Sequence, residues 1–148
     1  MRNTIAVAAP LAAALALAGQ LFAGGFWLQL GNPEASAEAR KAGAVVTIKA
    51  VGCHDPATAQ LTATAIGMVA GSRQSIPLKV TKLSEAGMFA LTQQWPKEGR
   101  CVIELVGKNG EQFTNTLVPA DAKGVDRLHA KFDMKQFGDR DVAAMLQE

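Results

Sequence analysis

Between residues 44 and 133 the chain alternates apolar and polar side chains in short segments. In residues 44–51, Val46 and Ile48 share one face while Thr47 lies on the other. A period of two over so few residues is typical of half-buried β-strands. The same pattern predicts six strands, at residues 44–51, 60–68, 76–81, 88–94, 100–108 and 112–118.

A seventh strand is predicted at residues 125–133, with Leu128 and Phe132 facing inward and His129 facing outward. A helix over the same residues is the alternative, because the segment also tolerates a helical pattern. The end of the chain, from Asp139 onward, predicts a short helix. Asp139 is a candidate N-cap, and the apolar residues Val142, Met145 and Leu146 recur at helical spacing.

Turn residues separate these segments and indicate how they connect. Asn109-Gly110 predicts a type I′ hairpin between the strands on either side of it. Gly71-Ser72 and Ala86-Gly87 mark two further turns, and Pro77 indicates an edge strand or a bulge. We therefore expect an all-β fold: a seven-stranded antiparallel immunoglobulin-like sandwich with a short C-terminal helix.

The start of the chain has a different pattern. Arg2 is its only charge before Glu34, and the stretch from Ile5 to Leu30 is almost continuously apolar. Ala35 and Ala37 follow, at the spacing that a signal-peptide cleavage site requires. The sequence predicts a signal peptide over residues 1–37, cleaved after Ala37, and a β-sandwich domain over residues 38–148. An uncleaved membrane anchor is the alternative, because the apolar run is long enough to span a bilayer.

The net charge of the chain argues against two classes of binding partner. The whole chain has a net charge of +2, and removal of Arg2 and Glu34 with residues 1–37 leaves that value unchanged. Near-neutral charge with interspersed signs argues against nucleic-acid binding and against strong attraction to an acidic membrane. The export pattern places the domain outside the cytoplasm, in the periplasm or the medium, with membrane contact only if the N-terminal segment is retained.

The chain has two cysteines, Cys53 and Cys101. In an oxidising compartment, an isolated pair in a small β-domain is most simply a disulfide. The sequence therefore predicts a Cys53–Cys101 bond that would stabilise the domain.

The neighbours of Cys53 allow a second interpretation. In Gly52-Cys53-His54-Asp55-Pro56 a thiol lies beside an imidazole, and copper favours cysteine and histidine ligands with methionine as a weak axial ligand. Cys53 and His54 are thus candidate copper ligands. Residues that would complete the set are Cys101, His129 and one of Met68, Met88 or Met134. The simpler interpretation is a loop with an exposed His54 and a turn at Asp55-Pro56.

The motifs of common catalytic sites are absent from the sequence. It contains no C-x-x-C, no G-x-S-x-G, no H-E-x-x-H and no glycine-rich phosphate loop. We therefore expect no enzymatic activity. Trp95, in the turn Trp95-Pro96-Lys97-Glu98-Gly99, is expected either to cover one end of the sandwich or to form an exposed platform for a ligand.

Residues 87–105 carry a resemblance to a known group of domains. Gly-Met-Phe-Ala-Leu is followed by the turn Trp-Pro-Lys-Glu-Gly and by the strand Arg-Cys-Val-Ile-Glu-Leu. This order resembles the YtkA-like and CopC-like periplasmic β-sandwich domains. The resemblance implies a sandwich fold, a periplasmic location and an association with copper.

Together these features predict an exported, non-catalytic β-sandwich that acts as a binding or accessory module of the cell envelope. Its partner would be a protein or an envelope surface. The alternative is a periplasmic copper-handling domain that uses Cys53 and His54.

Overall fold

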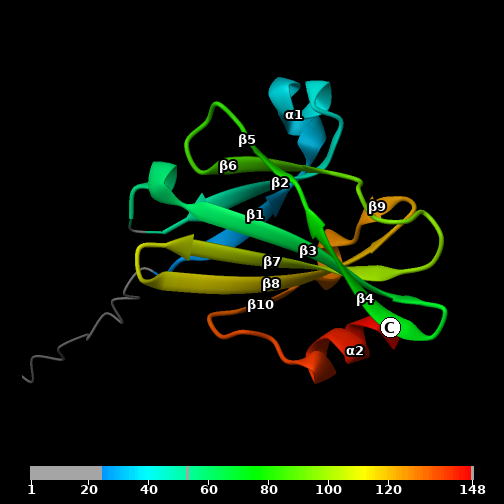
Figure 1. The fold of residues 1–148 in the computed structure, drawn as a ribbon. Coiled ribbons are helices and arrows are strands. Elements are labelled where there is room, and N and C mark those ends of the chain that lie inside the picture. The colour runs from blue at the N-terminus through cyan, green and yellow to red at the C-terminus, as the bar shows by residue number, and fades with distance from the viewer. Residues whose placement is uncertain (1–24, 53, 148) are drawn as a thin grey trace, which may run out of the picture.

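The computed structural model describes residues 25–52 and 54–147. Its strands form two antiparallel sheets with a hydrophobic core between them, and a short helix covers the outer face of one sheet (Figure 1). The expectation of an all-β sandwich with a C-terminal helix is confirmed. The described residues form ten strands rather than the seven predicted, because two of the predicted segments are divided and β1 lies in the segment predicted to be a signal.

The first sheet has four strands in the order β1-β2-β6-β5. All its neighbours are antiparallel. Its strands are β1 (Trp27–Gly31), β2 (Ala44–Val51), β5 (Val80–Lys82) and β6 (Met88–Thr92).

The second sheet has six strands, with the order β10-β8-β7-β3-β4 and β9 paired to β8. Its strands are β3 (Gln60–Val69), β4 (Ser72–Leu78), β7 (Cys101–Asn109), β8 (Gln112–Asp121), β9 (Gly124–Val125) and β10 (Lys131–Asp133). β3, β7 and β8 are the long central strands, so this sheet forms the larger wall of the core.

The helices are short and lie outside the sandwich. They are η1 (Pro33–Ala35), α1 (Ala37–Lys41), η2 (Pro56–Thr58), η3 (Arg127–His129) and α2 (Asp139–Gln147). Val142 and Met145 of α2 pack on Val102 and Leu117, on the outer face of the second sheet. A helix of this length is marginal alone, and this apolar contact is what holds it in place.

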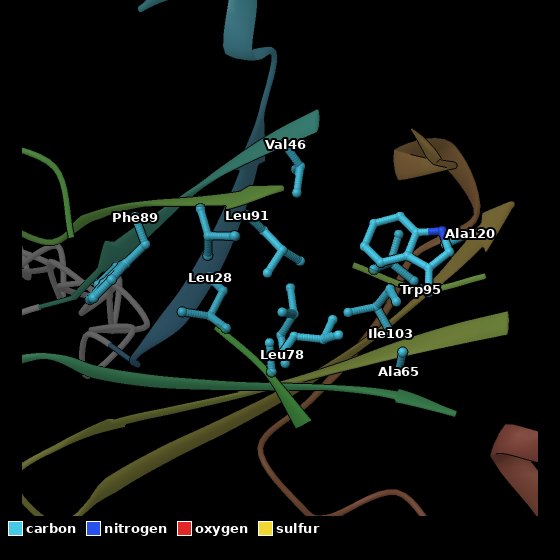
Figure 2. Packing of buried hydrophobic residues seen from close by; sticks show 14 of the residues in the cluster. Leu28, Val46, Ala65, Leu78, Phe89, Leu91, Trp95, Ile103 and Ala120 are labelled. Carbon is cyan, nitrogen blue, oxygen red and sulfur yellow. The ribbon is translucent and has the colours of Figure 1, made fainter. Parts of the chain in front are cut away.

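The core lies between the two sheets (Figure 2). Leu28, Ile48 and Leu91 from the first sheet meet Ile103 and Leu105 from the second, and all are almost fully buried. Figure 2 shows Phe89 at one end of this core and Trp95, beside Ala120, at the other. The alternating apolar positions of the predicted strands are therefore the residues that form the interior.

The predicted strand at residues 76–81 is two strands in different sheets. β4 ends at Leu78 in the second sheet, and β5 begins at Val80 in the first. The prediction of one strand was wrong because the apolar period continues across a point where the chain changes sheets. Pro77 lies on β4 at the edge of its sheet, as its missing N–H requires.

The predicted seventh strand, residues 125–133, is also divided. The Asp126 carboxylate accepts a hydrogen bond from the Leu128 N–H and starts η3 in the middle of the segment. Leu128 is 92% exposed and Phe132 is 53% exposed, so their predicted inward orientation was wrong. Local capping by an aspartate overrides the alternating pattern here.

The turns differ from the prediction in position. In the β7–β8 hairpin Asn109 pairs with Gln112, so the loop is Gly110-Glu111, and only Gly110 of these two has a positive φ. This arrangement is that of a type II′ turn rather than the predicted type I′. The β3–β4 hairpin has the type I′ signature instead, because Ala70 and Gly71 both have positive φ.

The N-terminal boundary of the fold lies well before residue 38. β1 pairs along its whole length with β2, and the side chains of Phe26 and Leu28 are 2% and 1% exposed. The boundary drawn from the sequence between Ala37 and Glu38 therefore cuts through the fold. The earlier part of the predicted signal segment lies outside the described residues. None of the helices in residues 25–52 and 54–147 has the length and hydropathy to cross a bilayer.

Candidate functional site

Cys101 is a free, buried thiol at the start of β7. Cys53 lies outside the described residues, but its neighbours are placed: a ring carbon of His54 is 3.9 Å from the position of a Cβ built on Gly110. Gly110 follows the far end of β7. The nine residues of that strand place its two ends about 26 Å apart. The structure therefore does not support the expected Cys53–Cys101 disulfide: Cys101 is a free thiol, and His54, next to Cys53 in the chain, lies near the opposite end of β7, whereas bridged Cα atoms lie within about 7 Å.

The environment of Cys101 makes it unreactive. Burial raises the pKa of the thiol to about 11, and the negative charge of Asp121 contributes to the rise. The thiolate is the form that attacks electrophiles and binds soft metals. In the folded domain Cys101 therefore behaves as a small apolar residue of the core.

The two histidines lie in separate places. His54 is exposed in the loop between β2 and β3. His129 is exposed in η3, where its Nδ1 lies 2.7 Å from Oδ2 of Asp126. The hydrogen bond from His129 lowers the pKa of the Asp126 carboxyl. Within the part of the chain that the structure describes, no three His, Cys, Asp or Glu side chains gather into a metal-binding group.

Of the candidate methionine ligands, Met134 lies at the same end of the molecule as His54. Its Cε is 3.2 Å from the position of a Cβ on Gly25, and a Cβ on Gly52 would lie 3.1 Å from the Gly25 carbonyl oxygen. Met68 lies on β3 at the position paired with Arg73, near the other end of the sandwich. Met88 also lies at the His54 end, because it lines a hollow together with Pro56 and Ala57 of the same loop. The structure therefore brings two of the candidate methionines, but neither Cys101 nor His129, toward the segment that carries His54.

Trp95 is part of the core. Its side chain is 4% exposed, and its indole N–H donates to the Asp121 carbonyl oxygen at 3.0 Å. Of the two arrangements expected for Trp95, the exposed aromatic platform was wrong: the ring covers the end of the sandwich (Figure 2). The hydrogen bond satisfies the only polar atom of the indole, which allows the ring to be buried.

Beside Trp95 there is a small hollow, here called the Trp95 groove. Its volume is about 50 Å³. Gly67 has no side chain, and this leaves room for Cys101 against β3: a Cβ at Gly67 would lie 3.4 Å from the Cβ of Cys101. The oppositely charged Glu98 and Arg100 also line the hollow. Its mainly apolar walls include Gly67, Val69, Ile76, Trp95, Pro96 and Cys101.

The β3–β4 hairpin forms one wall of this groove and carries three exposed apolar side chains. Met68 is 54% exposed, Val69 45% and Ile76 36%. β4 is also the last strand of its sheet, so one side of its main chain faces away from β3. An apolar hollow next to a free strand edge is a combination that proteins use to bind extended peptide segments.

The main chain just beyond the end of β4 is already occupied. The side-chain amide of Gln94 bonds both the N–H and the carbonyl oxygen of Lys79. Main-chain directions alternate along a strand, so Pro77, Ser75 and Arg73 also face outward. Pro77 has no N–H to offer. The donors that remain free for a partner are therefore those of Ser75 and Arg73.

Sequence reasoning did not identify the groove. Its walls come from the β3–β4 hairpin and from residues 95–101, which are separated along the chain by β5 and β6, and Gly67 gives no local signal of a binding surface. The exposed position of Ile76 was also hidden, because Ile76 fits the alternating strand pattern with Leu78 and Val80. Comparison with protein-family models, with characterised proteins and with solved structures finds no match.

Proposed function

We propose that this protein is an exported, non-catalytic binding or accessory module of the cell envelope with an immunoglobulin-like topology. Strand order supports the topology. The sheet β1-β2-β6-β5 corresponds to the immunoglobulin order A-B-E-D, and β8-β7-β3-β4 corresponds to G-F-C with an added strand beside C. The predicted export signal supports the location.

The observation that carries the binding role is the Trp95 groove beside the free edge of β4. The occupant we propose is an extended segment of another envelope protein that carries an apolar side chain. A strand added to β4 would point alternate side chains toward the face on which Gln74 and Ile76 line the groove. The groove volume of about 50 Å³ fits a small aliphatic side chain.

The experiment is site-specific photo-crosslinking in the cell that produces the full chain. Gln74 is replaced by p-benzoylphenylalanine, with the same replacement at exposed Lys41 of α1 as the matched control. We expect a discrete adduct with one other protein from position 74 and none from position 41. Adding Ser75→Pro, which removes an outward donor while leaving the β3 side of β4 intact, should abolish the adduct.

Other results would contradict the proposal. Equal adducts from positions 74 and 41, an adduct that persists in the Ser75→Pro variant, or no adduct from position 74 would remove the groove as a binding site. An adduct of twice the chain mass would show that β4 pairs with a second copy instead.

Copper handling is a second candidate, favoured by the placement of Met134 at the end of the molecule that carries His54. Soft Cu(I) accepts imidazole and thioether ligands. Titration of the full chain with Cu(I) alone should show stoichiometric uptake that falls at least tenfold in affinity in His54→Ala and in Met134→Leu. Met68→Leu is the matched control and should bind as the wild type does. Equal uptake by all four proteins would exclude this site.

A further inference from the structure

The segment that resembles an export signal overlaps the folded domain. β1 (Trp27–Gly31) pairs residue for residue with positions 47–51 of β2. Phe26 and Leu28 are buried in the core and pack against Gly107: a Cβ at Gly107 would lie 3.0 Å from side-chain atoms of both. This part of the apolar run is therefore a structural strand.

The cleavage motif at Ala35 and Ala37 is also part of the fold. Ala35 ends η1, and Ala37 is the first residue of α1. Between them the Ser36 hydroxyl caps α1 by accepting the Ala39 N–H. A cut after Ala37 would remove β1, the cap of α1 and two core side chains. The two alanines at the required spacing therefore lie inside the folded domain.

An earlier motif satisfies the same rule. Ala16 and Ala18 have the required spacing and follow the apolar run from Ile5 to Leu15, with Arg2 before it. Such a run has the usual length of a signal-peptide core. Ala23 is a weaker candidate, because the large residue Leu21 would occupy the position that must be small.

We propose that the exported chain is processed between Ala18 and Gly19, so that the mature protein retains β1. This inference rests on the proposed export. It moves the start of the mature chain from Glu38 to Gly19 and makes the immunoglobulin-like sheet β1-β2-β6-β5 complete in the exported form.

The test is the intact mass of the full chain expressed in a secreting bacterial host and recovered from the envelope and the cytoplasm separately. We expect an exported species that begins at Gly19. A species that begins at Glu38 would overturn the inference, and so would an unprocessed chain in the membrane whose domain is accessible to external protease, although export itself would stand. An unprocessed chain found only in the cytoplasm would remove both proposals.

Two matched variants separate the motifs. Ala18→Arg should block processing and accumulate the precursor. Ala37→Arg replaces an exposed residue at the start of α1 and should be processed as the wild type is. Blocked processing in Ala37→Arg together with normal processing in Ala18→Arg would overturn the assignment.

Discussion

The side-chain amide of Gln94 pairs with the main chain of Lys79 in both directions. Oε1 accepts from the Lys79 N–H at 2.8 Å, and Nε2 donates to the Lys79 carbonyl oxygen at 2.8 Å. Lys79 is the residue at which the chain leaves β4 for β5, between the two sheets. Gln94 thus makes the two main-chain hydrogen bonds that a neighbouring strand would make to Lys79, at the point where the chain crosses from one sheet to the other.

Loss of the hydrogen bonds between Gln94 and Lys79 should destabilise the segment in which the chain crosses from one sheet to the other. Gln94→Ala is expected to lower the free energy of unfolding by about 1 kcal/mol, because the bonds are solvent-exposed. Urea denaturation measures the change. Gln136→Ala, at an exposed position in the loop before α2, is the control and should leave the midpoint unchanged. An equal effect of the two substitutions would contradict a special role for Gln94.

Asn109 should matter more than its place beside a turn suggests. It is buried: its Nδ2 donates to the Asp55 carbonyl oxygen at 3.1 Å, and its Oδ1 accepts from the Thr58 hydroxyl at 2.8 Å. Asn109→Ala removes both bonds and is expected to cost about 1–3 kcal/mol, since each hydrogen bond contributes about 0.5–1.5 kcal/mol. Lys108→Ala, one residue earlier and exposed, should cost little in the same urea titration. Similar midpoints for both variants would show that the amide does not hold the loop.

Trp95 should be the more important of the two tryptophans for stability. Trp95→Ala removes a large buried ring and is expected to cost about 3–5 kcal/mol. Trp95→Phe keeps most of the apolar volume but loses the bond to Asp121 and should cost less. Trp27→Phe is the control, because Trp27 is 47% exposed. A greater loss from Trp27→Phe than from Trp95→Phe, by chemical denaturation, would contradict the assignment.

Cys101 should resist alkylation in the native state and react once the chain unfolds. In a Cys53→Ser background, iodoacetamide labelling followed by mass spectrometry measures this directly. Rapid native labelling at neutral pH would contradict the burial of the thiol.

The same thiol should give a pH dependence of stability. Its pKa is about 11 when folded, against an ordinary value of 9.0, so between these values the unfolded chain binds fewer protons. Stability should therefore fall as pH rises from about 9 to about 11, and remain unaffected by this group below that range. Cys101→Ala should remove this contribution. An identical pH profile for both proteins would contradict it.

Local pattern was enough to predict most of the strands. The segment 44–51 alternates apolar and polar side chains and is β2 with the same limits, because a strand between core and solvent must present one face to each. The helix at Asp139–Gln147 was predicted in the same way from the spacing of Val142 and Met145.

Prediction from the local sequence failed where the same local pattern is compatible with two different tertiary arrangements. The mainly apolar residues 27–31 suit an export segment and a half-buried strand alike, and only their pairing with β2 distinguishes the two. Residues 76–81 alternate without a break although the chain changes sheets at Lys79. The Cys53–Cys101 disulfide is not supported by the free thiol at Cys101, because cysteine number and compartment carry no information on the distance between two cysteines.

The sequence by itself determined the class of fold, the limits of the central strands and the C-terminal helix, since these depend on side-chain period and on turn residues close in the chain. The tertiary structure decided which strands are neighbours, that Cys101 is a free thiol in the core, and that Gly67, Ile76 and Trp95 line one groove. These features depend on contacts between residues far apart in the chain, which form only when the two sheets close over a common core.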